Sequence, residues 1–326
     1  MNDFLNQVDN ENVLVIGDVM IDAYLWGAVN RISPEAPVPI VTVTKRENRL
    51  GGAANVGLNL KSLGANPIIC SVIGSDDGGD IILDLMEESQ MTSVGLILSK
   101  KRKTTKKTRV LSNGQQLLRV DDEITYQIAK DLEDSLIERI EHLIHERSIG
   151  AIIFEDYDKG VITKRLIDSV VELAKANKII VAADPKKNQY DDYHDIDLFK
   201  PNFKEFVEGS KQDFFRGDTE SIFKYAKQII SEKDFKNVMV TLSDLGVFIT
   251  DGKVFHLIPA EYRQIADVSG AGDSVISIAT LLLLNGYSIK TIADISNKAG
   301  GIVCEKVGVV PIEIEDLLAE INSELD

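Results

Sequence analysis

The residues with the clearest chemical potential form one short stretch near position 270. Residues 267–274 read Asp-Val-Ser-Gly-Ala-Gly-Asp-Ser and run directly into an apolar helical segment. Glycines permit backbone conformations closed to other residues, and free amides at a helix start, helped by the helix dipole, bind anions. Phosphoryl transfer needs such donors beside a base for the attacking hydroxyl. The stretch therefore predicts an anion hole at Gly270, Ala271 and Gly272, with Asp273 as the base. The alternative is an N-capped helix behind a glycine turn.

A second stretch with chemical potential lies near the start of the chain. Residues 51–55 read Gly-Gly-Ala-Ala-Asn at the beginning of a helical pattern. Small residues allow a ligand to approach the backbone closely, and the amide of Asn55 can hydrogen-bond a hydroxyl group. The alternative is a tight turn that allows close helix packing.

Several common site motifs are missing from the sequence. There is no Gly-x-x-x-x-Gly-Lys-Ser/Thr, which excludes a P-loop NTPase. The first strand is followed by Gly-Asp-Val-Met at 17–20 rather than Gly-x-Gly-x-x-Gly, which argues against a Rossmann dehydrogenase. The four histidines are scattered, and no His/Cys cluster has zinc spacing.

The overall charge restricts the partners. The net charge is −16 and the pI about 4.8, so the protein's field repels nucleic acid and anionic lipid. The first twelve residues lack the basic and apolar regions of a secretory signal. The longest apolar run, 275–284, is too short to span a bilayer. We therefore expect a cytoplasmic protein that binds neither nucleic acid nor membrane.

Strands and helices alternate along most of the chain. The patterns predict strands at 13–17, 38–43, 67–74, 151–154, 179–184 and 237–241, and helices at 55–63, 129–147, 163–177, 219–232 and 272–285. An Asn-Gly turn at 113–114 predicts a hairpin over 105–120. Repeated βα units with apolar strands indicate a parallel sheet covered on both faces, whose ligands bind at the carboxyl ends of the strands. We expect one α/β domain over 1–326, with a small β extension from segments within about 18–45 and 100–122.

At this point a resemblance to a known family can be stated. The two glycine stretches, about 215 residues apart, resemble the two signatures of the ribokinase-like (PfkB) carbohydrate kinases. Asn202 and Glu205 are similar to that family's Asn-x-x-Glu motif, and residues 241–246 are similar to the segment that borders the nucleotide. The resemblance implies a ribokinase-like three-layer sandwich with a mainly parallel central sheet and a small β-sheet lid, and ATP and Mg²⁺ as cofactors.

Further motifs resemble one branch of this family, the D-glycero-β-D-manno-heptose-7-phosphate kinases. They lie at 17–22, 31–39, 115–121, 156–160 and 184–186. The branch phosphorylates the anomeric 1-hydroxyl to give the 1,7-bisphosphate, in ADP-heptose and lipopolysaccharide precursor synthesis. In many members the kinase is fused to a C-terminal nucleotidyltransferase. This sequence stops at 326, so we expect no such domain here. Ser274 stands where the branch commonly has Thr, and Asp158 lies inside its Asp-Tyr-x-Lys-Gly motif.

The resemblance also implies roles for individual residues. The sugar hydroxyls are expected to contact Asp18, Asp22, Gly51, Gly52 and Asn55. ATP is expected to contact Asn202, Glu205, Thr241, Ser243, Gly246, Asp267 and Asn297, with Glu205 acting indirectly on Mg²⁺. The resemblance further implies a monovalent cation and a homodimer formed through the β extension.

Clustered positive charge supports a phosphosugar substrate in this acidic chain. Residues 100–109 hold seven cations in ten positions, and the first four of these positions are expected on a solvated hairpin face. Candidates for the substrate phosphate are Lys107, Arg109, Arg119, Lys159 and Lys186. Two alternatives stay open: another phosphosugar, such as fructose 1-phosphate or tagatose 6-phosphate, or a non-catalytic sugar-binding regulator. The intact Asp273 and Gly-Ala-Gly argue against the regulator.

Overall fold

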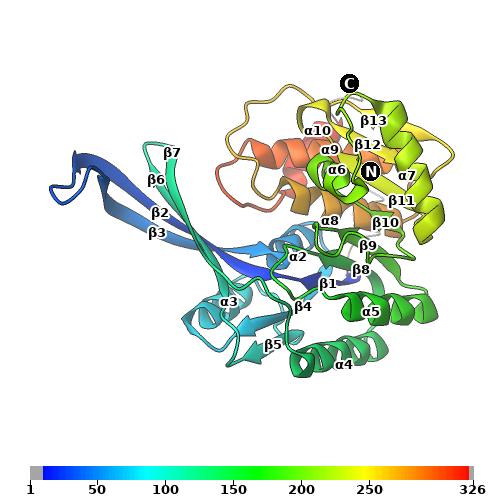
Figure 1. Cartoon of the computed structure of the whole chain (residues 1–326), viewed down its shortest axis with the longest axis horizontal. Helices are drawn as coiled ribbons and strands as arrows, with labels where there is room; N and C mark the ends of the chain where they lie inside the picture. The colour runs from blue at the N-terminus through cyan, green and yellow to red at the C-terminus, as the bar shows by residue number, and fades with distance from the viewer. Residues whose placement is uncertain (1–9, 323–326) are drawn as a thin grey trace.

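The computed structural model describes residues 10–322, and its centre is a nine-stranded sheet covered by helices on both faces (Figure 1). Strand β1 (Asn12–Gly17) lies inside this sheet, paired in parallel with β4 and β8. Its side chains alternate between the two faces, so Val13 and Val15 belong to one apolar core and Leu14 and Ile16 to the other. This explains why the strand is apolar at every position.

The strand order of the large sheet is β13-β12-β11-β10-β9-β8-β1-β4-β5. Pairing is parallel from β5 to β11 and antiparallel at β12 and β13. The other strands are β4 (Asn66–Gly74), β5 (Leu96–Ser99), β8 (Ile149–Glu155), β9 (Ile180–Asp184), β10 (Leu198–Phe199), β11 (Asn237–Thr241), β12 (Val247–Thr250) and β13 (Phe255–Ile258).

Two groups of helices cover the large sheet and make it the middle of three layers. One face carries α2 (Ala53–Ser62), α3 (Asp77–Glu88), α8 (Ala271–Leu284), α9 (Ile289–Cys304) and α10 (Ile314–Asn322). The other carries α4 (Lys130–Glu146), α5 (Lys164–Asn177), α6 (Phe203–Ser210) and α7 (Thr219–Lys233). A short 3₁₀ turn, η1 (Ser243–Leu245), follows β11. The expected three-layer α/β class is confirmed.

Most predicted elements are found within two residues of their expected ends, but the patterns do not predict helices α3, α6, α9 and α10 or strands β5, β10, β12 and β13. Helix α9 is the longest of these. Its middle contains Gly300 and Gly301, which disfavour a helix by roughly 1 kcal/mol each relative to alanine. The structure supplies the reason for the first glycine. A Cβ on Gly300 would lie 2.9 Å from the Val275 side chain, so the glycine allows α8 and α9 to pack closely.

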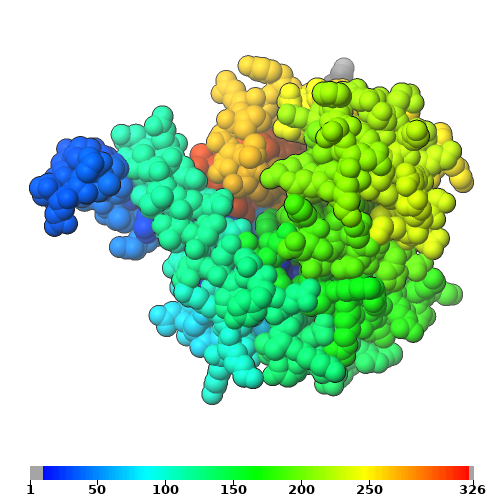
Figure 2. All heavy atoms as spheres, viewed as in Figure 1, coloured from blue at the N-terminus to red at the C-terminus, as the bar shows by residue number. Residues whose placement is uncertain are grey.

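The second sheet, called the small sheet below, has the strand order β3-β2-β6-β7. Its strands are β2 (Val19–Ile32), β3 (Pro39–Gly52), β6 (Thr105–Ser112) and β7 (Gln115–Asp122). Strand β3 continues to Gly52, beyond the expected limit near 45. The β6–β7 turn has positive φ at Asn113 and Gly114, as the Asn-Gly signal predicts. The β2–β3 hairpin projects from the body of the molecule, and its tip stands clear of the remaining surface (Figures 1 and 2).

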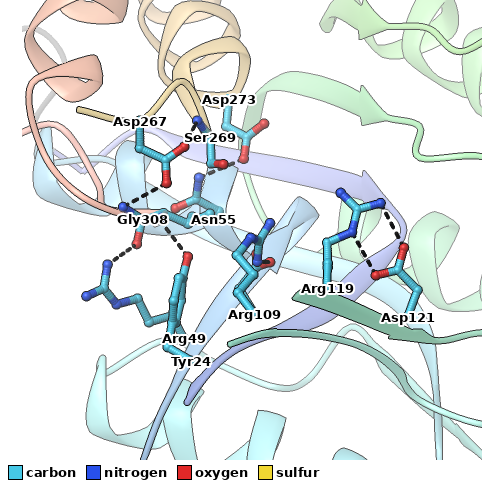
Figure 3. Close-up of polar contacts among 12 residues, drawn as sticks. Tyr24, Arg49, Asn55, Arg109, Arg119, Asp121, Asp267, Ser269, Asp273 and Gly308 are labelled. Atoms are coloured by element: carbon cyan, nitrogen blue, oxygen red, sulfur yellow. Dashed lines mark hydrogen bonds and ion pairs between the residues drawn. The ribbon is translucent and has the colours of Figure 1, made fainter. Parts of the chain in front are cut away.

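The root of the small sheet is attached to a loop near the other end of the chain. The amide of Val309 donates to the Tyr24 hydroxyl at 2.9 Å, and Arg49 Nη1 donates to the carbonyls of Val307 and Val309 at 3.1 Å each (Figure 3). The Arg49 guanidinium also lies 4.9 Å from the Tyr24 ring centre. These contacts fix the position of the loop beside the small sheet.

The two cysteines, Cys70 and Cys304, are buried and form no disulfide. Among the helices of residues 10–322, none is long and apolar enough to cross a membrane.

Candidate active site

The two glycine stretches meet at the starts of helices α2 and α8. Gly52 caps α2 with φ 60°, and a Cβ there would lie 2.2 Å from the Asp18 carbonyl oxygen. This geometry brings Asn55 into the first turn of α2, where its Nδ2 donates to Asp273 Oδ2 at 2.6 Å (Figure 3). The stretches are therefore two halves of one site.

Asp273 is a buried carboxylate with two side-chain donors. It is 3% exposed, and its Oδ1 accepts a hydrogen bond from the Tyr157 hydroxyl at 2.8 Å. Burial raises the pKa of Asp273 to about 6, and the nearby Asp184 adds to this rise. The hydrogen bonds from Asn55 and Tyr157 and the charge of Lys200 lower the pKa and oppose it. Asp273 is therefore a stronger base than an exposed aspartate and remains largely ionised at neutral pH.

The start of helix α8 has the features of an anion site. Gly270 adopts φ 86° at the N-cap, and no side chain caps the helix start. A Cβ added to Gly272 would lie 3.6 Å from Asp184 Oδ2 and 3.7 Å from Lys200 Nζ. An anion bound at these amides would therefore lie close to a buried ammonium group.

Asp267 holds the loop that leads into α8. Its Oδ1 accepts from the Ser269 amide at 3.0 Å, and its Oδ2 accepts from the Gly308 amide at 3.1 Å (Figure 3). Asp267 thus connects the glycine turn to the loop that Tyr24 and Arg49 hold.

A cavity of about 900 Å³ opens beside this helix start. It is lined by five of the seven residues predicted to contact ATP: Asn202, Thr241, Ser243, Gly246 and Asn297. Ala271 and Gly272 also line it, so the cavity ends at the anion site. Its volume lies in the range of small-molecule sites.

The other two residues predicted to contact ATP, Glu205 and Asp267, do not line the cavity. Glu205 and Asn202 form a capping box at the start of α6, with the Asn202 amide donating to Glu205 Oε2 at 2.8 Å. Glu205 Oε1 lies 2.6 Å from Lys186 Nζ. Within residues 10–322, no group of three or more His, Cys, Asp or Glu side chains is arranged to hold a metal ion. Both carboxylate oxygens of Glu205 therefore already have partners, and its indirect role at Mg²⁺ remains a prediction.

The residues predicted to contact the sugar lie on the small-sheet side of Asp273. Both oxygens of Asp18 accept backbone amides: Oδ2 from Tyr157 and Lys159, and Oδ1 from Val161, at 2.9–3.0 Å. Asp18 therefore organises the loop after β8, and its predicted sugar contact remains a prediction. Asp22 forms an ion pair with Arg109, and a Cβ on Gly51 would lie 2.1 Å from Asp22 Oδ2.

Four of the five cations predicted to hold the substrate phosphate have carboxylate partners. The pairs are Arg109 with Asp22, Arg119 with Asp121, Lys159 with Glu123, and Lys186 with Glu205 and Asp184. Arg119 lies on the exposed strand β7, where both of its bonds to Asp121 measure 2.9 Å (Figure 3).

Lys107 differs from the other four cations. No ion pair with it is found among residues 10–322, and its Nζ lies 5.2 Å from the centre of the Tyr157 ring. Burial and the neighbouring Lys159 lower the pKa of Lys107, because both disfavour its positive charge. Of the five cations, Lys107 is the one most available to an anionic ligand.

The sequence reasoning gave no role to three residues of this site. Lys200 is 1% exposed and pairs with Asp184 Oδ2 at 2.7 Å. Tyr157 contacts Asp273. Glu155, at the end of β8, is buried, and neither of its carboxyl oxygens has a hydrogen-bond partner among residues 10–322. Burial and the nearby Asp184 raise the pKa of Glu155 well above its usual value. Their positions in the sequence could have indicated them, because Glu155 ends a parallel strand and Tyr157 and Lys200 closely follow one.

Comparison with known proteins agrees with this geometry. Residues 10–315 match the description "pfkB family carbohydrate kinase". The chain is 38% identical over 319 residues to the bifunctional protein HldE of Syntrophotalea carbinolica, covering 97% of this chain and 64% of the relative. It is 35% identical over 317 residues to the protein of that name from Campylobacter jejuni subsp. doylei, covering 97% and 66%. The chain thus spans about two thirds of the length of these relatives.

Solved structures share the fold at low sequence identity. Phosphofructokinase-2 from Escherichia coli, in complex with substrates and products, superimposes with a TM-score of 0.78 at 19% identity over 97% of this chain and 99% of that one. The same enzyme in complex with potassium gives 0.78 at 18% identity over the same shares. These likenesses show the ribokinase-like fold. Together with the match over residues 10–315, they establish that the chain belongs to the pfkB family of carbohydrate kinases.

Proposed function

We propose that this ATP-dependent sugar kinase phosphorylates the anomeric 1-hydroxyl of D-glycero-β-D-manno-heptose 7-phosphate. The product would be the 1,7-bisphosphate, a precursor for ADP-heptose and lipopolysaccharide. The observation that carries the proposal is the position of Asp273 in the first turn of α8, where Ala271 and Gly272 line the large cavity. Asp273 also accepts a hydrogen bond from Tyr157, whose ring centre lies 5.2 Å from Lys107 Nζ of the small sheet. The branch motifs and the 35–38% identity to proteins named HldE support the choice of heptose.

The mechanism follows from the surroundings of Asp273. ATP occupies the 900 Å³ cavity with its γ-phosphate at the start of α8. The acceptor hydroxyl attacks the γ-phosphorus in line, and the bond from that phosphorus to the β,γ-bridging oxygen breaks, so that ADP leaves. The hydroxyl proton passes to Asp273. Proton transfer is late, since bonding to phosphorus acidifies the hydroxyl, and most of the catalysis is positioning and charge stabilisation. The amides of α8 and the ammonium of Lys200 face the charge that develops on the phosphoryl oxygens.

Mg²⁺ bound together with ATP would supply positive charge that offsets the charge of the phosphate groups. The Glu205 carboxylate is engaged by the Asn202 amide and by Lys186, so it would act on Mg²⁺ through water. The resemblance to the family also leads us to propose a monovalent cation.

Lys107 is the best candidate for the 7-phosphate. It lies on β6 of the small sheet, close to the Tyr157 ring, and forms no ion pair within residues 10–322, although the charges of Asp22, Glu123 and Asp121 favour its charged form. Lys186 and Lys159 lie near the same ring or loop but are already paired. The small sheet would close over the heptose as a lid and exclude water.

The proposal is tested by a coupled ADP-release assay over a panel of sugars. We expect heptose 7-phosphate to give a kcat/KM well above that of heptose, fructose 1-phosphate and tagatose 6-phosphate. Equal kcat/KM for heptose and its 7-phosphate would contradict a phosphosugar substrate. A higher kcat/KM for fructose 1-phosphate or tagatose 6-phosphate would identify a different substrate, and the protein would still be a sugar kinase. Binding of a sugar phosphate without any ADP release would indicate a regulator.

We also propose a homodimer formed through the small sheet. Leu117, Leu118 and Val120 on β7 are between 43% and 57% exposed, which is typical of a surface that a partner covers. Light scattering after size exclusion should give twice the chain mass. Leu118→Asp should shift the protein toward the monomer, and a monomeric wild type would contradict the proposal.

A further inference from the structure

The Tyr157 hydroxyl and the Asn55 amide hold Asp273 from two elements. Tyr157 Oη donates to Oδ1 at 2.8 Å, and Asn55 Nδ2 donates to Oδ2 at 2.6 Å. Tyr157 belongs to the loop after β8, whereas Asn55 belongs to α2. The last torsion of an aspartate is soft, so two donors on different oxygens fix the plane of the carboxylate.

The backbone that carries Tyr157 is itself held. Asp18 accepts the amides of Tyr157, Lys159 and Val161. Gly160 has φ 87°, and a Cβ there would lie 2.2 Å from the Tyr126 carbonyl oxygen. These contacts therefore hold the loop in one conformation, and they fix the backbone position from which the Tyr157 side chain extends.

Two ammonium groups fix the ring of Tyr157. Lys107 Nζ and Lys186 Nζ each lie 5.2 Å from its centre. Lysines within about 6 Å of an aromatic ring are attracted to its face. One comes from the small sheet and the other from the segment after β9, so the ring connects the two sides of the site.

We infer that Tyr157 is a positioning residue for phosphoryl transfer, whose hydroxyl orients the Asp273 carboxylate toward the acceptor hydroxyl. The inference rests on the proposed role of Asp273 as base. A carboxylate offers about four lone-pair sites. Tyr157 and Asn55 use two of them, which leaves a defined lone pair for the substrate. Tyr157 itself transfers no proton, because burial and the charge of Asp273 raise its pKa well above the usual value.

The inference has a consequence for pH dependence. Other charged groups around Asp273 are Glu155 on β8, Asp184 on β9, Lys200 after β10 and, beyond the Tyr157 ring, the ammoniums of Lys107 and Lys186. Loss of the Tyr157 hydroxyl removes a donor that lowers the pKa of Asp273, while burial and Asp184 continue to raise it. The acid limb of the rate profile should therefore move to higher pH.

The test compares Tyr157→Phe with Tyr193→Phe. Tyr193 is a matched control because it is fully buried, and its hydroxyl has no hydrogen-bond partner within the part of the chain that the structure describes. The assay follows ADP release with heptose 7-phosphate between pH 5 and 9. Substrate phosphates titrate in this range, but their effect is the same for every variant. We expect Tyr157→Phe to lower kcat by about 10- to 100-fold, to change KM for ATP little, and to raise the pH of the acid limb. Tyr193→Phe should match the wild type.

Two results would overturn the inference. An unchanged kcat and pH profile in Tyr157→Phe would mean that Tyr157 only packs in the site and that its hydroxyl does not orient Asp273. A higher kcat/KM would mean that the hydroxyl obstructs the base. Asp273→Asn in the same series separates this failure from that of the proposed function. An active Asp273→Asn would remove the base assignment, whereas an inactive Asp273→Asn beside a normal Tyr157→Phe would remove only the inference. If no sugar is turned over, thermal unfolding against pH replaces the assay. Tyr157→Phe should then lose stability relative to Tyr193→Phe as the pH rises from 5 to 7, and parallel curves would overturn the inference.

Discussion

The side-chain amide of Asn55 lies 2.6 Å from Oδ2 of Asp273, although 218 residues separate the two positions in the chain. The contact joins the first turns of α2 and α8 at the carboxyl edge of the large sheet. It is a charge-assisted hydrogen bond between two buried side chains, and Asn55 is one of the two side-chain donors to Asp273.

Asp273→Asn should abolish most turnover while the protein remains folded and binds ATP. A positioned base contributes roughly 10²- to 10⁴-fold to the rate, so kcat should fall by about that factor. Steady-state ADP release gives kcat, and calorimetry gives ATP affinity. Retention of more than about a tenth of wild-type kcat would remove Asp273 from the role of base.

The stability of the wild type relative to Asp273→Asn should depend on pH. The pKa of Asp273 is about 6 in the folded protein, against the usual 3.8. A carboxyl group with a raised folded pKa contributes stability at low pH, and this contribution is lost as the pH rises through the folded value. The free energy of unfolding of the wild type, measured relative to the variant by urea denaturation, should fall by about 2–3 kcal/mol between pH 4 and 7. A constant difference would contradict the raised pKa.

Gly272→Ala should affect turnover without harming the fold. A Cβ at this position would be no closer than 3.6 Å to Asp184 and Lys200. Alanine also has a higher helix propensity than glycine. The methyl group would lie where the phosphoryl group must approach α8, so kcat should fall while the melting temperature is kept or raised. Gly286→Ala is a control at the opposite end of α8, with open space around its Cβ; it should leave kcat unchanged, although its φ of 73° costs some stability. Normal turnover in Gly272→Ala would contradict the anion hole.

Lys107→Met should discriminate between phosphorylated and unphosphorylated substrates. Hydrogen bonds to charged groups contribute roughly 1.5–3 kcal/mol, so kcat/KM for heptose 7-phosphate should fall by about 10- to 100-fold. The kcat/KM for heptose should fall much less, because for this sugar only the contact between Lys107 and the Tyr157 ring is lost. Lys106→Met is the matched control, because neighbouring side chains on β6 point to opposite faces of the small sheet. Equal losses for both sugars would place Lys107 outside the phosphate site.

Lys200→Met should destabilise the fold strongly. Lys200 is 1% exposed and pairs with the buried Asp184, and removal of one partner of a buried pair costs about 3–5 kcal/mol. Lys164→Met breaks a lysine–aspartate pair on the exposed surface of α5 and should cost less than about 1 kcal/mol. Both values come from urea denaturation. Similar values for the two variants would mean that the Asp184 charge finds another partner, such as Lys186.

The fold and the two glycine stretches could be predicted because their signals are local. Strand β1 is apolar on both faces, and glycines mark the starts of both helices. The ion pairs of the cations could not be predicted in the same way. Arg109 meets Asp22 because β2 and β6 pair in parallel in a particular register, which no local pattern specifies. Arg119 and Asp121 are an instructive exception, since side chains two apart on a strand share a face.

Lys200 and Tyr157 illustrate a different limit of the sequence. Lys200 follows β10, a strand of two residues that is too short for a periodic signal. A lysine directly after a strand is usually expected at the surface, but Lys200 is buried, with its ammonium group beside Asp184 and close to Gly272 of α8. Tyr157 lies in the Asp-Tyr-x-Lys-Gly motif at 156–160, but its contact with Asp273 depends on the loop conformation that Asp18 stabilises.

The anchoring of the small sheet limits how this protein can be recombined with its relatives. Residues 19–52 form a continuous hairpin, which makes them an apparent unit for exchange. Their root nevertheless binds the backbone at 307–309 through Tyr24 and Arg49. The Gly308 amide of the same loop donates to Asp267, in the segment that leads into the anion site. A chimaera that exchanges the hairpin alone would separate these interacting positions. A chimaera designed for altered sugar specificity should therefore take residues 19–52 and the loop at 307–309 from the same parent, although the two segments lie near opposite ends of the chain.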